Sequence, residues 1–498
     1  MSKRHVVIIG SGNAALCAGL AALDAGADAT ILEKADAREA GGNSRYTAGA
    51  MRFAYSSPEE ILPLLRNRRD ARLERTEFGA YPVSQFEADM LFFNDGLPLN
   101  ELQRHLTADS YATMLWLTGH NVRFDPIYSR QAFEKDGKHV FWGGLTLEAK
   151  GEGVGLVDAE LGEFTRLGGT IVYRADCHEL EKLDGRVRGV RFVSPGGKQS
   201  ISCDAVVLAC GGFEASADMR GRLLGERWKR AKVRGTPHNT GAGLTMALHA
   251  GAELYGRPDG CHAVPMDRHM PDYGNRDLPF ILRKNYRKIC YFLGVMLNAR
   301  GERFVDEGEN FRNYTYAQFG RAILEQPGSF AWQVFDEKVA ALLYDEYRFE
   351  HASSVEADTL EELVTLLQDV DADGALTTLQ QFNAAVDETA PFDPTSLDGR
   401  CTQSLALNKT NWANRLDTPP YRAYPVTCGI TFTYAGVKID PSAAVLDKTG
   451  QPIPGLYACG EMVGGIFFDG YPGGSGLTSG AVFGRMAGHS AATSAASG

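Results

Sequence analysis

The sequence has no surplus of positive charge and no long hydrophobic run. Its 498 residues include 51 Lys and Arg against 62 Asp and Glu, which gives a formal charge of −11. A general nucleic-acid-binding protein would carry a basic face, so this class is excluded. No segment approaches the roughly 20 apolar residues that span a membrane, and no signal-peptide core precedes a cleavage site. These absences predict a cytoplasmic protein without a direct membrane span.

Paired cysteines are also lacking. The nine cysteines are odd in number and include no C-x-x-C pair, so we expect neither a disulfide framework nor a metal site. The chain is too apolar to be disordered, because hydrophobic residues make up 44% of it. Single hydrophobic cores seldom grow beyond roughly 250–300 residues, so we expect more than one domain.

Glycine, in contrast, is in excess, with 56 residues and no collagen-like period. Its first cluster is Gly10-Ser11-Gly12-Asn13-Ala14-Ala15, between a β-branched run at residues 6–9 and an Ala-rich helical stretch; the next strand ends at Glu33. In such a βαβ unit the glycines let the backbone approach a pyrophosphate, and the acid accepts hydrogen bonds from a ribose. The motif predicts dinucleotide binding; the alternative is a glycine turn without a ligand.

Further glycine-rich turns favour a flavin over a nicotinamide. They lie at residues 41–50, 211–213, 455–461 and 473–477. A flavin dinucleotide needs chain segments at its adenosine, its pyrophosphate and its isoalloxazine ring, whereas a domain that binds only NAD would not need the return near the C-terminus. We therefore expect FAD as the cofactor.

These blocks resemble the fumarate reductase/succinate dehydrogenase flavoprotein superfamily. The resemblance rests on GSGNAAL, GGNSRYTAGAMR, DAVVLACGGF, NTGAG, GERFVDE, GLYACGE and GGSGLTSGAVFGRMAG, which follow the family's order over almost the whole chain. Within the superfamily the sequence is most similar to the FAD-dependent tricarballylate dehydrogenases. The blocks that carry this closer similarity are GGNSRYTAGAMRFAY, RFVDEGENFRNYTYAQFGRAILEQPG and YPGGSGLTSGAVFGR.

The resemblance implies an α/β fold in which a Rossmann-like FAD-binding domain is interrupted by an α+β substrate-capping domain. We expect the FAD-binding domain at residues 1–257 and 426–498 and the cap at residues 258–425. The insertion at residues 58–120, mostly helical by its period, is placed with the FAD-binding domain.

Matching the family motifs residue by residue implies the cofactor contacts. Ser44 stands where the respiratory members attach FAD through a His, so the FAD is expected to be non-covalent. Ala242 stands where the family has an Asp, so the contact that a carboxylate makes in the family is not expected here. The amides that open the last helix would stabilise charge on the reduced ring. The cofactor-binding residues implied in this way are Gly10, Gly12, Asn13, Ala14, Glu33, Lys34, Asn43, Ser44, Gly49, Gly212, Gly460, Glu461, Ser475, Gly476 and Leu477.

The catalytic motifs of the fumarate reductases are matched only in part. His262 matches a substrate-binding His, and Glu307 matches the acid of the proton path, with Arg312 as its expected partner. The proton-relaying Arg falls on Ala340 and the second His on Phe432, so neither a fumarate reductase nor a succinate dehydrogenase is predicted. The structural alternatives are a buried, hydrogen-bonded His262 and a surface pair of Glu307 with Arg312.

The last substrate Arg of the family falls on Tyr471, in Tyr471-Pro472-Gly473. This motif resembles the Tyr-Pro-Gly of 3-ketosteroid dehydrogenases, in which the Tyr hydroxyl and a backbone amide hold a ketone oxygen. Arg287 is a candidate for binding a carboxylate, because guanidinium groups form paired hydrogen bonds with carboxylates; a solvated Arg287 is the alternative. The catalytic base is left open among Tyr291, Tyr314, Tyr316 and Tyr344.

We expect an FAD-dependent dehydrogenase that introduces a C=C bond α,β to a carboxyl or carbonyl group of a small carboxylate, similar to tricarballylate dehydrogenase, by hydride transfer to flavin N5. The alternative is a ketone-activated desaturase of a cyclic keto acid, such as 4-oxocyclohexanecarboxylate, or of a 3-ketosteroid. A third possibility is a flavoprotein that uses FAD as a scaffold. The sequence has no iron–sulfur motif, so electrons would pass to an external acceptor, which is a partner redox protein, a quinone or oxygen.

Overall fold

The chain forms two compact units. The computed structural model describes residues 3–494. Unit 1 comprises Met1–Gly225, Gly235–Cys261 and Phe432–Gly498, and unit 2 comprises Glu226–Arg234 and His262–Thr431. The expected boundaries at 257/258 and 425/426 therefore fall at 261/262 and 431/432. Residues 226–234 belong to unit 2 because the strand that they contain, β14, pairs with β20 of that unit.

Unit 1 is built on a six-stranded sheet with the order β22-β23-β13-β1-β2-β9. Its strands are parallel apart from β22, and Ile9 lies opposite both Leu32 and Leu208. The buried β-branched residues of β1 suit a parallel sheet covered on both faces, and the predicted α/β class is confirmed. The strands are His5–Ile9 (β1), Asp28–Glu33 (β2), Thr170–Tyr173 (β9), Ala205–Leu208 (β13), Ala444–Leu446 (β22) and Pro452–Ala458 (β23).

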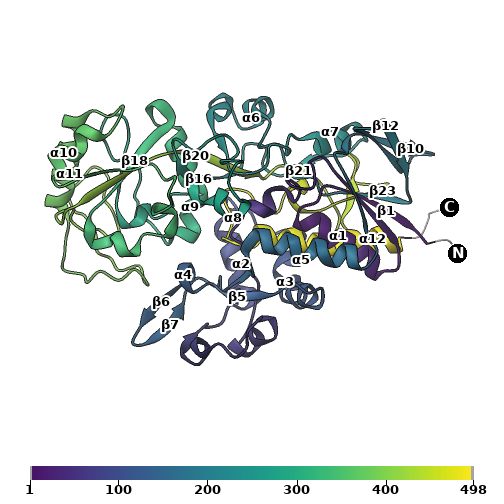
Figure 1. Ribbon diagram of the computed structural model, residues 1–498, viewed down its shortest axis with the longest axis horizontal. Helices are drawn as coiled ribbons and strands as arrows, with labels where there is room; N and C mark the ends of the chain where they lie inside the picture. Colours follow the sequence, from purple (N-terminus) through teal and green to yellow (C-terminus); the bar gives the residue numbers. More distant parts are fainter. Residues whose placement is uncertain (1–2, 495–498) are drawn as a thin grey trace. The chain divides into compact units, whose positions relative to one another are not determined.

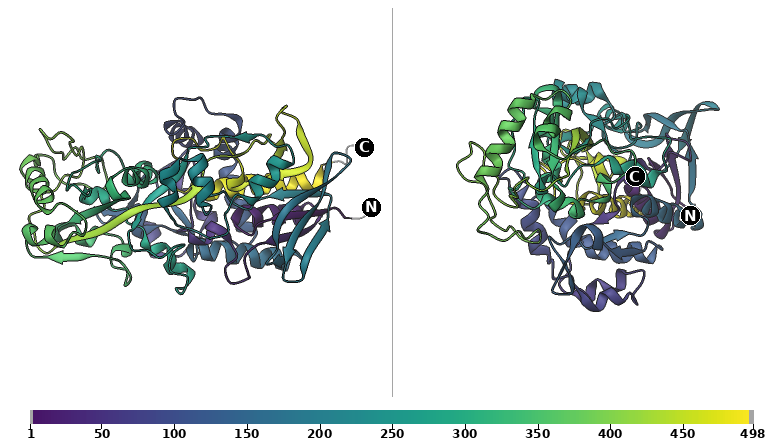
Figure 2. Two further views of the ribbon diagram at one scale, coloured as in Figure 1. Left: turned by 90° about the horizontal axis from the view of Figure 1, so that it is seen from above. Right: turned by 60° about the vertical axis from the view of Figure 1, so that its left-hand side comes forward.

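Helix α12 (Ser475–Thr493) lies along α1 (Asn13–Asp24), as Figures 1 and 2 show. The two backbones come close because glycines of α12 face α1. A Cβ at Gly484 would lie 2.5 Å from the Ala14 carbonyl oxygen, and one at Gly488 would lie 2.0 Å from that of Ala18. Glycine is therefore required at these two positions, and it places the first turn of α12 beside the first turn of α1.

The insertion at residues 58–120 lies in unit 1, but only its second part is helical. A capping box fixes the start of its longer helix, because Asn100 and Gln103 exchange two side chain-to-backbone hydrogen bonds of 3.0 Å. The other elements of unit 1 are β3 (Ala50–Met51), β4 (Thr76–Glu77), α2 (Val83–Phe92), α3 (Glu101–Gly119), β5 (Phe124–Pro126), α4 (Tyr128–Gln131), β6 (Ala132–Lys135), β7 (Lys138–Phe141), β8 (Leu147–Ala149), α5 (Glu152–Arg166), β10 (Asp176–Leu183), β11 (Arg186–Ser194), β12 (Gly197–Ser202), α6 (Ala217–Leu223), α7 (Ala242–His249), β15 (Leu254–Tyr255) and β21 (Gly436–Val437).

Unit 2 is organised around the long strand β20. The sheet order is β14-β20-β18-β17, and β16 and β19 also pair with β20. One apolar cluster packs Leu363, Leu379 and Phe382 of two helices against this sheet. The elements are β14 (Lys232–Val233), β16 (Cys261–Asp267), α8 (Phe280–Arg283), β17 (Val295–Leu297), α9 (Arg312–Leu324), β18 (Phe330–Phe335), β19 (Val355–Ala357), α10 (Leu360–Leu366), α11 (Ala372–Ala385) and β20 (Tyr421–Thr433).

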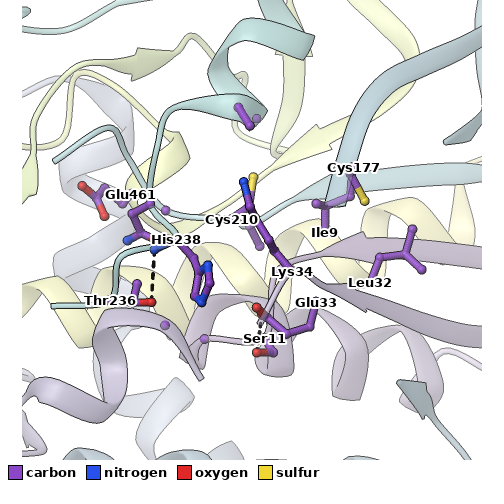
Figure 3. Close-up of a pocket in the computed structure, with 18 of the residues that line it drawn as sticks. Ile9, Ser11, Leu32, Glu33, Lys34, Cys177, Cys210, Thr236, His238 and Glu461 are labelled. Atoms are coloured by element: carbon purple, nitrogen blue, oxygen red, sulfur yellow. Dashed lines mark hydrogen bonds between the residues drawn. The ribbon is translucent and has the colours of Figure 1, made fainter. Parts of the chain in front are cut away.

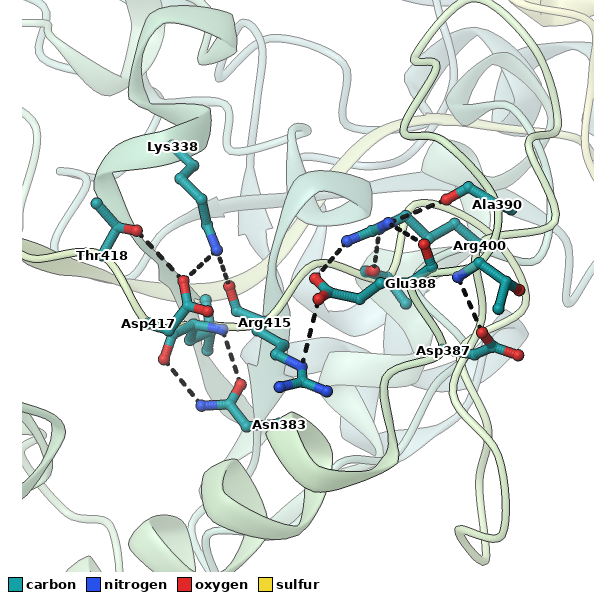
Figure 4. Close-up of polar contacts among 12 residues, drawn as sticks. Lys338, Asn383, Asp387, Glu388, Ala390, Arg400, Arg415, Asp417 and Thr418 are labelled. Atoms are coloured by element: carbon teal, nitrogen blue, oxygen red, sulfur yellow. Dashed lines mark hydrogen bonds and ion pairs between the residues drawn. The ribbon is translucent and has the colours of Figure 1, made fainter.

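A long segment of unit 2, residues 387–420, contains neither helix nor strand. Side chains satisfy its backbone groups instead (Figure 4). Arg400 donates to the carbonyl oxygens of Ala390 and Ala413, at 2.9 Å each, and Lys338 donates to that of Arg415 at 2.8 Å. These contacts replace the ladder bonds of regular structure.

Candidate functional site

A pocket lies at the carboxyl ends of β1, β2 and β13, and all of its lining residues belong to unit 1 (Figure 3). Gly10 follows β1 with a φ of 104°, and a Cβ there would lie 2.5 Å from the Ala209 carbonyl oxygen. The turn therefore requires glycine. Of the predicted cofactor residues, Gly10, Gly12, Ala14, Glu33, Lys34, Asn43, Ser44 and Glu461 line the pocket.

Glu33 lies at the end of β2 with its carboxyl group buried. The Ser11 hydroxyl donates to one carboxyl oxygen, and the Ala35 amide donates to the other at 2.6 Å. Burial raises the pKa of Glu33, and these two hydrogen bonds oppose the rise. Each carboxyl oxygen keeps a lone pair for a ribose hydroxyl, which is the role that the motif predicts.

A second carboxyl group, that of Glu461, also lines the pocket, although it is far from Glu33 in the sequence. The Thr433 amide donates to it at 2.7 Å. It interacts with the fully buried Glu214, whose carboxyl group accepts 2.6 Å hydrogen bonds from the side-chain amides of Asn43 and Asn239. Burial and the neighbouring Glu461 hold the pKa of Glu214 well above its ordinary value, which favours the protonated form of this carboxyl group.

The remaining predicted cofactor residues do not line this pocket, but several of them support it. The Asn13 backbone N–H donates to the Ser44 hydroxyl at 3.0 Å, and its side-chain amide donates to the Leu477 carbonyl oxygen at 2.8 Å. Gly212 leaves no room for a Cβ beside Glu461. The predicted residues outside the lining are Asn13, Gly49, Gly212, Gly460, Ser475, Gly476 and Leu477.

Several lining residues were missed by the sequence prediction. Four of them belong to the glycine-rich sequence blocks of the family, and this position in a block is the signal that could have identified them: Ser11, Gly211, Asn239 and Gly243. Ala242 also lines the pocket, so the position that the family gives to an Asp faces the site without a carboxyl group. Thr236, His238 and Cys177 had no local signal, because only the tertiary fold brings them to the pocket.

A family model described as an FAD binding domain matches residues 5–477. The chain belongs to this FAD binding domain family. It is 27% identical to the NADH:acrylate oxidoreductase of Vibrio harveyi, over 98% of this chain and 50% of that protein. It is 26% identical to the 4-oxocyclohexanecarboxylate 2-dehydrogenase of Sinomonas cyclohexanicum, over 99% of this chain and 94% of that protein.

The fold of this flavoprotein is similar to that of a flavocytochrome c3 fumarate reductase. The TM-score is 0.72 with 24% identity, over 98% of this chain and 78% of that one. The predicted superfamily is confirmed, and the protein is an FAD-dependent oxidoreductase. The pocket suits FAD, because glycines clear the backbone at its centre, the Glu33 carboxyl group lies where the motif expects a ribose acid, and the Glu461 carboxyl group lies among hydroxyl and amide donors.

Tyr471 of the flavoprotein is buried among aromatic rings of unit 1. Its ring centroid lies 5.2 Å from that of Phe432 and 5.4 Å from that of Phe467, both in edge-on contact. A Cβ at Gly476 would lie 3.9 Å from both the Phe432 and Tyr471 rings. The phenol therefore stands in an apolar surround next to the first turn of α12.

His262 lies in unit 2, at the second position of β16, and is almost fully buried. Its ring contacts that of Tyr316 edge-on, with centroids 5.0 Å apart. Burial, together with the guanidinium groups of Arg234 and Arg287, holds the pKa of His262 well below its ordinary value. The imidazole is therefore neutral at neutral pH. Arg234 was not predicted, because no motif in the sequence around it indicates a functional role.

The expected pair of Glu307 with Arg312 is wrong. Glu307 forms an ion pair with Arg303 and accepts a 2.8 Å hydrogen bond from the Met296 amide. Arg312 instead donates to the Tyr344 hydroxyl at 2.7 Å. Arg303 lies only four residues before Glu307 and pairs with it, so the carboxylate has a nearer partner than Arg312. Glu307 thus holds the loop before α9.

Arg287, the predicted carboxylate ligand, is buried and forms an ion pair with Glu346. Among the candidate bases, Tyr291 is fully buried and hydrogen-bonded to Thr315 at 2.6 Å, and Tyr344 accepts the hydrogen bond of Arg312. Tyr316 is half-buried against His262.

Within residues 3–494, no helix has the length and apolar character needed to cross a membrane. The same residues contain no group of three or more His, Cys, Asp or Glu side chains arranged to hold a metal ion.

Proposed function

We propose that this flavoprotein dehydrogenates a small keto acid and introduces a C=C bond next to the ketone. The observation that carries the proposal is the aromatic surround of Tyr471, formed by Phe432 and Phe467. A phenol shielded from water donates a stronger hydrogen bond to a ketone oxygen than a solvated one. Apolar rings also suit a hydrocarbon ring better than a set of carboxylates.

In this proposal FAD supplies the acceptor of the hydride. Tyr471 holds the ketone oxygen and so acidifies the adjacent C–H group, and a base removes that proton. The FAD is proposed to be non-covalent, since Ser44 offers a hydroxyl in place of the His of covalent members.

In unit 2, the guanidinium groups of Arg234 and Arg287 near His262 are donors of the kind that bind carboxylates. The named substrate of the Sinomonas cyclohexanicum relative, 4-oxocyclohexanecarboxylate, carries both a ketone and a carboxylate, which supports this substrate class.

Replacing Tyr471 with Phe tests the proposal. We expect anaerobic flavin reduction by 4-oxocyclohexanecarboxylate to slow by about 10²–10³-fold, as when one oxyanion donor is removed, with an unchanged flavin spectrum. Tyr434→Phe is the matched control, because its ring packs 5.3 Å from Phe432 in the same cluster; it should alter the rate by less than about 10-fold. Unchanged reduction in Tyr471→Phe would contradict the role of this hydroxyl.

A second candidate is the dehydrogenation of tricarballylate, favoured by the similarity of the sequence blocks and by the buried arginines around His262. Reduction of the flavin by tricarballylate but not by the keto acid would select it. A 3-ketosteroid is the third arm of the assay, since it offers a ketone without a carboxylate. In each case the electrons pass to an external acceptor, and we propose that the protein acts in the cytoplasm.

A further inference from the structure

A second pocket in unit 1 is lined largely by arginines. It lies where the segment before residue 70 meets the end of α3 and the start of β5. Leu65 bridges to Phe124, and the Arg66 amide donates to the Phe124 carbonyl oxygen at 2.9 Å, which fixes the two segments side by side. The cavity has a volume of about 470 Å³ and is lined by Arg66, Arg68, Arg69 and Arg123, with Asn67 and Thr118 between them.

Only one of these four arginines is neutralised by a carboxylate. Arg66 donates to both oxygens of Asp125, at 3.0 and 3.1 Å. Within the part of the chain that the structure describes, Arg68, Arg69 and Arg123 form no ion pair; Arg68 and Arg123 donate to the backbone carbonyl oxygens of Pro63 and Thr118. The cavity therefore has a local charge of about +3 in a chain whose net charge is −11.

We propose that this cavity binds an oligophosphate group, as in a nucleoside diphosphate or triphosphate. Arg68 and Arg69 are exposed to solvent and Arg123 is half-buried, so their guanidinium groups are accessible to an anion that enters the cavity. Each guanidinium presents a rigid fork of donors that matches phosphoryl oxygens. The volume exceeds that of a single phosphate and falls in the range of small-molecule sites, so a group with several phosphates fits both the space and the charge.

The cavity is separate from the FAD pocket. The two share no lining residue. Trp116 and His120, at the end of α3, each contact Asp24 at 2.9 Å, which places this region at the C-terminal end of α1. The FAD pocket lies at the opposite end of α1, and a helix of 12 residues spans about 18 Å. Oligophosphate binding here is therefore not a consequence of the dinucleotide motif.

The test uses the FAD-loaded full-length protein and inorganic triphosphate as the probe, measured by titration calorimetry in 50 mM NaCl. We expect one site per chain, weakened at least tenfold by the double substitution Arg68→Gln/Arg69→Gln and also by Arg123→Gln. Arg72→Gln is the matched control, because Arg72 lies in the same arginine-rich segment, pairs with Asp70 and does not line the cavity; it should change the affinity less than threefold.

A flotation arm identifies the source of the phosphate. Vesicles of phosphatidylcholine with phosphatidic acid, compared with phosphatidylcholine alone, test whether a lipid headgroup carries the phosphoryl oxygens. Triphosphate binding without flotation indicates a soluble ligand, and flotation that the double variant loses and Arg72→Gln keeps indicates a headgroup. The proposal is overturned if neither probe binds, or if Arg72→Gln weakens binding as much as the cavity variants do. Flavin absorbance and content check that every variant keeps its fold and its FAD.

Discussion

The carboxyl group of Glu214 lies fully buried beside a second carboxyl group, Glu461, and accepts hydrogen bonds from Asn43 and Asn239. The neighbouring Arg220 donates to the Glu214 backbone carbonyl oxygen. Two adjacent carboxyl groups cannot both ionise cheaply in an apolar interior. We infer that Glu214 keeps its proton while Glu461 accepts hydrogen bonds from Thr433.

This arrangement predicts a pH-dependent stability. As the pH rises above the ordinary pKa of glutamate, the unfolded chain releases the Glu214 proton while the folded protein retains it, so the free energy of unfolding falls with pH. Gln mimics the protonated acid without this penalty. We expect the free energy of unfolding of Glu214→Gln, relative to that of the wild type, to increase by about 1–3 kcal/mol as the pH rises from 5 to 8. Thermal unfolding of the FAD-free protein at several pH values measures this difference.

The control for this prediction is Glu179→Gln, which removes an exposed carboxylate that pairs with Arg191 on the neighbouring strand. Its stability difference from the wild type should stay nearly constant over the same pH range. A Glu214→Gln difference that is equally constant would mean that Glu214 ionises in the folded protein as it does in the unfolded chain.

Single residues of the site were predictable where their role is local. Gly10, Gly12 and Glu33 act within one βαβ unit, so their spacing in the sequence carries the information. Glu214 depends on Asn43, which is 171 residues away, and the surround of Tyr471 depends on Phe432. No spacing rule connects such pairs, because only the tertiary fold brings them together.

Among the elements, the contact of α1 with α12 places the C-terminal glycine-rich turn, residues 473–477, beside the dinucleotide motif. Because a Cβ at Gly488 would lie 2.0 Å from the Ala18 carbonyl oxygen, Gly488→Ala must push the helices apart. We expect a loss of about 1–3 kcal/mol in stability, together with weaker FAD retention, since Asn13 donates to Leu477 in the first turn of α12. Thermal unfolding and fluorescence of released FAD measure the two effects.

The same substitution elsewhere should have the opposite sign. Gly162 lies on the exposed face of α5, and a Cβ there would have no neighbour within 4 Å. Gly162→Ala should raise the stability by up to about 1 kcal/mol, because alanine favours the helix, and should leave FAD retention unchanged. If Gly488→Ala behaved in the same way as Gly162→Ala, the close contact of the two helices would not be needed.

Elements were predictable where the hydrophobic pattern is regular. The β-branched run at residues 6–9 lies in β1, His5–Ile9, and the Ala-rich stretch after the first glycine cluster forms α1, Asn13–Asp24. Residues 58–82, expected to be mostly helical, form turns, short 3₁₀ segments and the two-residue strand β4 instead. Pro63 would break a continuous helix through this segment, and contacts such as the Leu65–Phe124 bridge fix an irregular path that the period of the sequence does not describe.

At the scale of the whole molecule, the net charge of −11 describes the chain as a whole, whereas the cationic groups are local clusters within it. The overall field repels anions, and the composition alone would argue against anionic ligands. The arginines at residues 66, 68, 69 and 123, and those near His262, are grouped locally by the fold. Composition averages over such groups, which is why it excluded nucleic acid as a partner but could not locate either set.

The division into two units predicts where FAD stabilises the chain. All lining residues of the FAD pocket belong to unit 1. A ligand stabilises the cooperative segments that form its site by RT ln(1 + [L]/Kd), so FAD should slow amide hydrogen exchange in β1, β2 and β13. The expected protection is at least tenfold at a hundredfold excess over Kd, whereas β17 and β18 of unit 2 should change less than threefold. Hydrogen-exchange mass spectrometry of the FAD-free and FAD-loaded protein measures both; equal protection of the two sets of strands would show that the units unfold as one.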